Sequence, residues 1–337
     1  MSIDDIVKNK NIMVTGGTGS FGHQIVSKLV EKNPNKILIY SRDEKKQYDL
    51  QNEFENYHDI IEFEIGDVRD YDKLYGSMKG VNILYHAAAL KQVPNCELHP
   101  FEAVKTNIIG AENVRRASIE NEVEIVVAIS TDKAVKPVNV MGMTKSIQER
   151  IILNSKNEKF STKFLCVRYG NVTGSRGSVI PFFKKRIKDN KYLPITSCEM
   201  TRFLLSLDEA IELVFKATVE GKNGQLFVKK MPAAYITDLA RTMSKAITGQ
   251  DDYPIKEVGV RPGEKIHEVL VSEEEMRRAE ETESHYVIHP YAKIDKPILL
   301  NNLVEYSSDV TDILTKQEII DLLTKEGFIH EDRNHWE

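Results

Sequence analysis

The chain has 337 residues, 41% of them hydrophobic and 29% charged, a composition typical of a soluble globular protein that can bury a sizeable core. Its formal net charge of −5 provides no overall basic field for nucleic acid, and no apolar run approaches the roughly 20 residues of a membrane span. The three cysteines are scattered and lack metal-ligand spacing, and "MSIDDIVKNK" lacks the apolar segment of a signal peptide. We therefore expect a cytoplasmic chain that binds no metal, no nucleic acid and no membrane.

The first half of the chain alternates between strand and helix patterns. Residues 81–90 have the continuous apolar character of a strand that is covered on both faces. In chain order the pattern predicts a strand, a glycine-rich turn and a helix over 11–32, strands over 36–46, 61–70 and 81–90, a helix over 103–122, a strand over 123–134, a helix over 142–157 and a strand over 162–172. This order predicts an α/β fold with a Rossmann-like, doubly wound parallel sheet and right-handed crossovers.

After Val172 the pattern changes to shorter and more mixed segments. It predicts a loop and helix over 173–187, a strand over 223–230 and a helix over 236–247, followed by the distinctive stretch "GVRPGEKIHE". We therefore predict a dinucleotide-binding domain from residues 8–172 plus about 200–230. A smaller, discontinuous α+β substrate domain would take about 173–199 plus 231–337.

Gly16, Gly19 and Gly22 stand directly after the first predicted strand and open the first helix. Glycine at this turn lets the backbone approach a pyrophosphate, and the helix N-terminus presents N–H groups to its charge. This context predicts a nicotinamide dinucleotide site. The residues expected to contact the dinucleotide are Gly16, Thr18, Gly19, Ser20, Phe21, Gly22, Ser41, Arg42, Lys45, Asp67, Val68, Ala87, Ala88, Ala89, Lys91 and Lys145.

The tip of the second strand bears on the choice between NADP and NAD. Ser41 and Arg42 stand there, with Lys45 and Lys46 nearby, and a hydroxyl and a guanidinium suit a 2′-phosphate. A solvated basic loop is the plainer interpretation, and the nearby Asp43 leaves NAD as the alternative. We predict NADP. Asp67 and Val68 would meet the adenine, whereas the three alanines 87–89 either leave room for the dinucleotide or serve tight strand packing.

The fifth strand ends in "STDKA", which places Ser130, Thr131, Asp132 and Lys133 at the edge where chemistry gathers in such sheets. Thr131 can bond a substrate oxygen, and an adjacent acid and base can each transfer a proton. A solvated loop or a helix cap is the alternative. Lys145 opens the next helix, where it can bond the nicotinamide ribose. Four residues before such a lysine a tyrosine usually stands, and here that position holds Met141, which could also be simple core packing.

The sequence resembles the extended short-chain dehydrogenases/reductases, and within them the nucleotide-sugar 4,6-dehydratases. The matching stretches are "AAALKQVPNCELHPFEAVKTNIIGAENV", "VRYGNVTGSRGSVIPFF", "MTRFLLSLDEA" and "VRPGEKIHE", within a resemblance that spans roughly residues 10 to 290. Related dehydratases carry Thr-Asp-Glu where this chain has Thr131-Asp132-Lys133. The lysine resembles the inverting UDP-N-acetylglucosamine 4,6-dehydratases, which change the configuration at C5.

Two branches of that group differ at the position of Met141. One branch makes the pseudaminic acid precursor and keeps the tyrosine, whereas the other makes L-sugar precursors for capsule or O-antigen and carries methionine, as in "MGMTK". The chain resembles the methionine branch, although "VRPGEKIHE" is as similar to the pseudaminic branch. The resemblance implies a recycled NADP, a UDP-sugar substrate and a homo-oligomer, with a hexamer suspected.

The resemblance also implies a role for each residue of the site. Lys133 would remove the C5 proton while Asp132 protonates the departing O6, and Thr131 would bind O4. Lys145 or Asp132 would take the O4 proton in place of a tyrosine, and a second epimerisation at C3 is chemically allowed. The expected substrate contacts are Lys91, Asn171, Arg176, Val179, Thr196, Arg202, Arg261 and Glu264, and the guanidiniums of the arginines suit a diphosphate.

Other interpretations stay open at this point. A nucleotide-sugar 4-epimerase or reductase of the same fold would need no acid/base pair for elimination. A catalytically silent nucleotide sensor has only Met141 in its favour. Cys96 is an extra proton donor or, more simply, a small buried thiol, and His86 suits packing or a cofactor contact better than general-base catalysis.

Overall fold

The computed structural model describes residues 2–154, 160–175, 177–290 and 303–329. The helices are α1 (Ile3–Val7), α2 (Ser20–Val30), α3 (Glu44–Glu53), α4 (Tyr71–Ser77), α5 (Val93–Leu98), α6 (Pro100–Ala103), α7 (Gly110–Glu120), α8 (Val140–Leu153), α9 (Val179–Lys188), α10 (Leu207–Glu220), α11 (Ile236–Thr248), α12 (Glu273–Met276) and α13 (Lys316–Lys325). Short 3₁₀ turns span Glu55–Tyr57 and Asp132–Ala134, and a π-helix spans Val104–Ile109.

The strands form one large and three small sheets. They are β1 (Asn11–Thr15), β2 (Lys36–Ser41), β3 (Ile61–Ile65), β4 (Ile83–His86), β5 (Ile125–Ile129), β6 (Lys163–Arg168), β7 (Asn171–Val172), β8 (Leu193–Ile195), β9 (Thr201–Leu205), β10 (Leu226–Lys229), β11 (Ala233–Tyr235), β12 (Ile255–Glu257), β13 (Val269–Val271), β14 (Ala279–Glu281), β15 (His285–Ile288) and β16 (Tyr306–Ser307).

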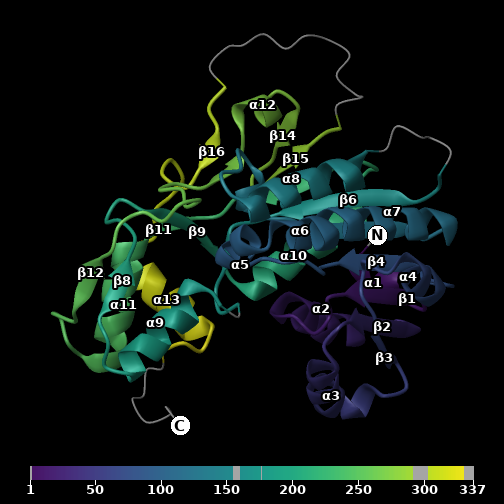
Figure 1. Cartoon of the computed structure of the whole chain (residues 1–337), viewed down its shortest axis with the longest axis horizontal. Coiled ribbons are helices and arrows are strands. Elements are labelled where there is room, and N and C mark those ends of the chain that lie inside the picture. The colour runs from purple at the N-terminus through teal and green to yellow at the C-terminus, as the bar shows by residue number, and fades with distance from the viewer. Residues whose placement is uncertain (1, 155–159, 176, 291–302, 330–337) are drawn as a thin grey trace.

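The large sheet has the strand order β14-β15-β10-β6-β5-β4-β1-β2-β3 (Figure 1). All neighbours from β10 to β3 run parallel, and β15 and β14 add antiparallel strands at one edge. The order reverses between β1 and β4, the point where ligands bind in doubly wound folds. The predicted α/β, Rossmann-like doubly wound parallel sheet is confirmed.

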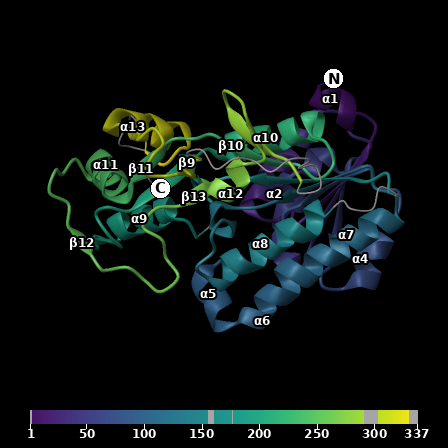
Figure 2. The same ribbon diagram turned by 90° about the horizontal axis from the view of Figure 1, so that it is seen from above.

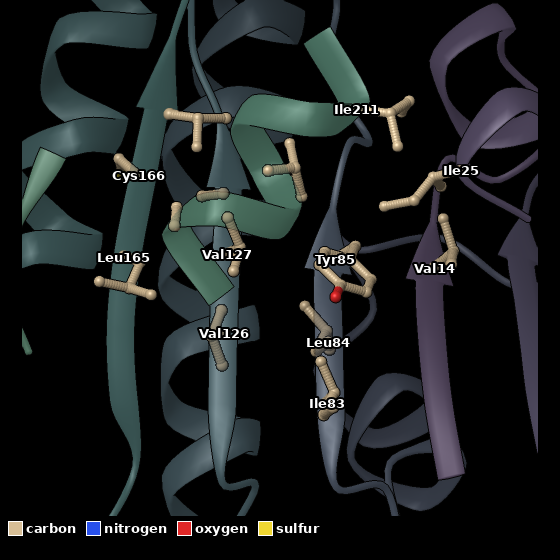
Figure 3. Packing of buried hydrophobic residues seen from close by; sticks show 14 of the residues in the cluster. Val14, Ile25, Ile83, Leu84, Tyr85, Val126, Val127, Leu165, Cys166 and Ile211 are labelled. Atoms are coloured by element: carbon tan, nitrogen blue, oxygen red, sulfur yellow. The ribbon is translucent and has the colours of Figure 1, made fainter. Parts of the chain in front are cut away.

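Helices cover both faces of this sheet, with α2 and α10 on one side and α4, α7 and α8 on the other (Figure 2). Apolar side chains of β1, β4, β5 and β6 fill the space beneath α2 and α10, where Ile25 and Ile211 approach Val14, Tyr85 and the neighbouring strands (Figure 3). The sequences of these strands are continuous apolar runs because helices bury the strands on both faces.

A second, smaller core lies beside the large one. It joins α9, α11 and α13 through buried residues that include Phe183, Leu239 and Leu323 (Figure 1). The small sheets β11-β9-β7 and β12-β8 belong to this region of the chain. Two segments far apart in sequence, Lys316–Lys325 and Val179–Lys188, therefore share one core.

Two features differ from the sequence pattern. The predicted strand 162–172 breaks into β6, which pairs with β5 and β10 in the large sheet, and β7, which pairs with β9 in a small one. β15 pairs with β10 and β14 pairs with β15 in the large sheet, although the proposed division placed residues 231–337 in the substrate domain. The other proposed domain boundaries stay a prediction.

The predicted helix 103–122 contains an irregularity that the pattern does not reveal. Its first turns are α6 and the π-helix Val104–Ile109, and only from Gly110 onward is it a regular α-helix. The π-helix places Thr106 on the wall of a large pocket. It also lets Asn107 bond both the N–H and the carbonyl of Leu90 and the hydroxyl of Thr144.

Candidate active site

A pocket with a volume of about 850 Å³ lies just beyond the carboxyl ends of the central parallel strands. Every residue of the predicted cofactor set lines it except Lys45. Of the predicted catalytic residues, Thr131, Lys133, Met141 and Lys145 line it, and Asp132 lies buried directly behind. The structure thus brings together side chains from the ends of β1, β2, β4 and β5 and from α8.

The glycine turn at the floor of the pocket leaves room for a pyrophosphate. Gly16 has a φ of +69°, and a Cβ there would lie 2.8 Å from the backbone of Ala88. A Cβ on Gly22 would lie 2.4 Å from the Cα of Gly17. α2 begins at Ser20 without a side-chain cap, so its N-terminus faces the pocket. These residues fit a nicotinamide dinucleotide, whose pyrophosphate the turn and the helix dipole would hold.

The tip of β2 carries charges of both signs. Arg42 and Lys46 line the pocket, and Arg42 forms an ion pair with Asp67 at 3.5 Å while Lys46 pairs with Asp43 at 2.5 Å. Lys45 turns away, is 81% exposed along its side chain and pairs with Asp49 one helical turn later. Lys46 is therefore the lysine of this tip that faces the pocket.

The candidate acid/base residues form one connected group. The Thr131 hydroxyl donates to Asp132 Oδ1 at 2.8 Å, and Lys133 Nζ donates to the same oxygen at 3.0 Å. Lys133 Nζ also lies 3.4 Å from Glu268 Oε1. Burial by itself would lower the pKa of Lys133, but the charges of Asp132 and Glu268 outweigh it and raise that pKa. In the resting site Lys133 is therefore protonated.

Lys145 has an environment of the opposite kind. Its ammonium group donates to the carbonyl of Ile129 at 2.5 Å and to Gln148 Oε1 at 2.8 Å. Burial lowers the pKa of Lys145 to about 8, so part of it loses its proton as the pH approaches 8. Burial, together with the charge of Lys145, lowers the pKa of His86 to about 3, and its Nδ1 is hydrogen-bonded to Thr15. His86 is therefore neutral.

Met141 lies on the first turn of α8, one helical turn before Lys145 on the same face of that helix. It is 4% exposed, packs in a cluster with Cys96 and Ala103, and lines the pocket. Burial raises the pKa of the Cys96 thiol, with the nearby Glu97 adding to the effect. Met141 thus contacts both the core and the pocket, and the thiol beside it stays protonated.

The predicted substrate contacts divide into two groups. Lys91 and Asn171 line the pocket, whereas Val179, Thr196, Arg202, Arg261 and Glu264 do not, and Arg176 falls outside the described residues. Glu264 accepts from the Thr196 hydroxyl at 3.2 Å and from the backbone N–H of Arg261 at 3.3 Å. These three residues therefore form a second group, which does not line the pocket.

Arg202 is placed differently from what its motif implies. It is 7% exposed, and its guanidinium donates to the carbonyls of Thr201, Lys265 and Ile266 at 2.7 to 2.9 Å. These bonds hold the segment before β13 against β9. Contact of Arg202 with a substrate diphosphate stays a prediction, and the contacts seen favour a structural role.

Residues 12–290 match the sequence profile of the family described as polysaccharide biosynthesis protein. The chain belongs to this family. A UDP-glucose 4-epimerase of Rickettsia bellii is 44% identical over 340 residues, which cover 96% of this chain and 98% of that protein. A Methanocaldococcus jannaschii protein described as an uncharacterized membrane protein is 41% identical over 334 residues, which cover 97% and 99%.

Solved structures agree with this assignment of the fold. Pen from Bacillus thuringiensis is similar with a TM-score of 0.90 at 36% identity, covering 96% of this chain and 99% of that chain. DesIV, a dTDP-glucose 4,6-dehydratase of Streptomyces venezuelae, has a TM-score of 0.68 at 18% identity, covering 76% and 86%, and shares the fold. Within the described ranges no helix of this polysaccharide biosynthesis family member combines the length and apolar character needed to cross a membrane.

Several buried polar atoms of the pocket lack a partner among the described residues. They include Thr106 Oγ1, Asn171 Oδ1 and Ser178 Oγ on the lining and Asp132 Oδ2 behind it. Buried polar atoms are ordinarily hydrogen-bonded, so water or a polar ligand would complete these positions. Thr106 and Ser178 escaped sequence reasoning, because a threonine in a helix and a serine in a loop carry no distinctive signal.

A buried ion network behind the pocket was also missed. Arg168, 1% exposed, binds Glu149 at 2.6 and 3.0 Å and Glu275 at 2.9 and 3.0 Å, and donates to the carbonyl of Leu270. Ser130 donates to Glu149 at 2.5 Å. The network therefore links the end of β5 and α8 to α12, more than a hundred residues away in sequence.

We expect Arg42→Ala to weaken NADP binding by about tenfold or more while NAD binding stays nearly unchanged, because a guanidinium bond to a 2′-phosphate contributes roughly 1.5–3 kcal/mol. Calorimetric titration of both dinucleotides measures the two affinities. Lys45→Ala is the matched control, since Lys45 lies outside the pocket lining. A wild-type preference for NAD, or an NADP affinity unaffected by Arg42→Ala, would contradict the assignment of this tip.

Proposed function

We propose that the chain is an NADP-dependent UDP-N-acetylglucosamine 4,6-dehydratase that inverts C5, giving a UDP-2-acetamido-2,6-dideoxy-L-hexos-4-ulose for surface polysaccharide. The observation that carries the proposal is the hydrogen-bonded group of Thr131, Asp132 and Lys133 behind and along the pocket wall. A hydride exchange at C4 alone needs no such pair, whereas loss of water across C5 and C6 needs a base and an acid.

The nicotinamide would supply reversible hydride transfer, accepting from C4 and returning to C6. The chain's own task in the first step is to receive the O4 proton. Lys145 is suited to this because its lowered pKa leaves part of it neutral near pH 8. Asp132 is the second candidate, since a substrate hydroxyl held by Thr131 would connect to Asp132 through the bond between them.

The pair Asp132 and Lys133 carries the protons that elimination requires. In the resting site the shared proton lies on Lys133. When Lys145 takes the O4 proton, Asp132 is still ionised, and transfer of the Lys133 proton to it across 3.0 Å produces a neutral amine and a protonated carboxyl. The amine can then take the C5 proton while the carboxyl gives its proton to O6, and water leaves. The pair ends as it began, and inversion follows when hydride returns to C6 and C5 receives a proton from solvent on the face opposite Lys133.

A nucleotide-sugar 4-epimerase is the second candidate. The observation in its favour is the 44% identity over nearly the whole chain to a protein named UDP-glucose 4-epimerase. An epimerase returns hydride to C4 and leaves C5 and C6 untouched. The dehydratase product therefore shows the NMR signal of a C6 methyl group, whereas the epimerase product has no methyl group at C6.

An NMR time course of the purified protein with UDP-N-acetylglucosamine, and separately with UDP-glucose, tests the proposal. We expect a new C6 methyl signal, solvent deuterium at C5, and no net growth of reduced-nicotinamide absorbance, because hydride returns to the product. Added exchange at C3 would show the second epimerisation that the 4-keto group allows. A 4-epimer without a methyl signal would establish the epimerase, and reduced cofactor formed in proportion to substrate would indicate an ordinary dehydrogenase.

Met141→Leu should keep most of the activity, because leucine has a similar volume and the thioether transfers no proton. Such swaps usually cost less than about 1.5 kcal/mol of stability. Initial rates and thermal melting check both statements, and Met143→Leu on the exposed side of α8 is the matched control. Loss of turnover in Met141→Leu with normal melting would show that the sulfur itself is needed.

A further inference from the structure

A buried carboxylate lies behind the acid/base group. Glu268 ends the stretch "GVRPGEKIHE", directly before β13, and is 3% exposed. Its Oε1 lies 3.4 Å from Lys133 Nζ, on which Asp132 Oδ1 also converges at 3.0 Å. Glu268 does not line the pocket, whereas Lys133 does. Lys133 is therefore the residue that connects Glu268 to the pocket lining.

The backbone around Glu268 is fixed from two sides. Its N–H donates to the Ser308 hydroxyl at 2.9 Å, and the Ser308 N–H donates to the Glu268 carbonyl at 2.8 Å. Upstream, the Thr201 N–H donates to the carbonyl of Ile266, and Arg202 donates to the carbonyls of Ile266 and Lys265. The carboxylate is thus held in place before any ligand arrives.

The charged groups around Glu268 come from several elements. Lys133 lies on one side, Lys265 Nζ lies 3.7 Å from Oε2, and Arg202 Nε lies 3.9 Å from Oε1. The nearby His267 directs Nδ1 to the Thr201 hydroxyl at 2.8 Å rather than to the carboxylate. Lys265 Nζ donates to the carbonyl of Val135 at 2.6 Å, and Oε2 of Glu268 has no hydrogen bond within the described ranges.

We propose that Glu268 is a positioning residue that holds the Lys133 ammonium group between two carboxylates and so keeps its proton in place until substrate binds. Lys133 Nζ is the one cation that touches both Asp132 and Glu268 among the described residues. The catalytic consequence rests on the proposed function, but the electrostatic relation between Glu268 and Lys133 does not.

The sign of the effect follows from charge. A carboxylate beside an amine favours the protonated amine, so Glu268 raises the pKa of Lys133 against the effect of burial. Removing the charge of Glu268 moves the deprotonation of Lys133 to lower pH. It also leaves Lys265 and Arg202 without their shared counter-charge, which lowers stability.

Competitive acetylation of the full chain tests the electrostatic relation without turnover. Acetic anhydride is applied in trace amounts over a pH series, and mass spectrometry follows the peptide that carries Lys133. In the wild type we expect the labelling midpoint of Lys133 to lie above that of ordinary exposed lysines. Glu268→Gln should move the midpoint to lower pH, Glu268→Asp should restore most of the shift, and the exposed Glu273→Gln should match the wild type.

Two results would overturn the proposal. One is a labelling midpoint of Lys133 in the wild type that lies at or below that of exposed lysines. This measurement needs no variant, so it can be made even if the Glu268→Gln chain fails to fold. The other is an unchanged midpoint in a folded Glu268→Gln chain.

Kinetics with UDP-N-acetylglucosamine provide the second arm. We expect the rising limb of the kcat–pH profile to move to lower pH in Glu268→Gln, with KM nearly unchanged because the carboxylate does not line the pocket. A large rise in KM with kcat unchanged would contradict a role through Lys133. Absence of dehydration in the wild type would sink the proposed function, and the labelling result would still decide the role of Glu268.

Discussion

Replacing Lys133 with alanine is expected to stop the exchange of the C5 proton with solvent deuterium and to lower turnover by about 10²–10⁴-fold, the usual effect of removing a general base. Lys133 lines the pocket and shares a proton with Asp132, so its loss removes the group that receives the C5 proton. Product formation and C5 deuterium are read by NMR in D₂O. Substrate binding should persist, since other residues of the pocket remain.

Companion variants separate this role from a general disturbance of the site. Asp132→Asn should bind substrate and lose dehydration, because an amide cannot give a proton to O6. Lys136→Ala is the matched control, since its exposed ammonium group pairs with Glu273 and Glu305 away from the pocket. Normal C5 exchange in Lys133→Ala would refute the division of labour between Asp132 and Lys133.

Arg168→Ala is expected to lower the free energy of unfolding by about 3–5 kcal/mol, because it leaves Glu149 and Glu275 as buried carboxylates without a counter-charge. Four side-chain bonds from Arg168 to these two residues are lost. Urea unfolding at neutral pH measures the change. Arg277→Ala, an exposed arginine on the turn after α12, is the matched control and should stay within about 0.5 kcal/mol of the wild type.

The pH dependence of this difference gives an independent check. Burial alone would raise the pKa of Glu275, but Arg168 and the bonds to it lower the pKa to about 2. A lowered pKa in the folded state stabilises the protein above the unfolded value of about 4.3, and that contribution is lost as pH falls toward 2. The stability gap between wild type and Arg168→Ala should therefore narrow between pH 4 and pH 2. A constant gap would show that Arg168 acts through packing.

Much of the large sheet could be predicted because its signals are local. The apolar run that ends at His86 and the glycines after Thr15 each depend on residues within one strand or turn. The break between β6 and β7 could not be predicted, since it depends on β7 pairing with the distant strand β9. For the same reason the return of β14 and β15 to the large sheet depends on which strand edge is free, which no local pattern records.

The residues of the candidate site also divide into those that a local sequence pattern predicts and those that only the fold brings together. Asp132 and Lys133 were found because they follow a strand directly, whereas Glu268 lies over 130 residues further on and meets Lys133 only in the fold. Arg202 was assigned to a diphosphate from its charge, but three carbonyls surround its guanidinium. Lys45 was grouped with Arg42 by proximity in sequence, yet the helix turns it toward Asp49.

In the π-helix Val104–Ile109, the number of residues in the segment decides which side chains face the pocket. That number is more important for the pocket than whether the segment is helical. Deleting one residue there would let the segment wind as an ordinary α-helix, locally the more favourable form. The wide turn takes up one extra residue, so its removal would shift the side chains within 104–109 by one helical position. Thr106 would leave the pocket, and Asn107 would lose its bonds to Leu90 and Thr144. A deletion that regularises the helix would thus remove one polar side chain from the pocket wall and the bonds that hold Leu90, so this irregular turn is the form on which the pocket depends.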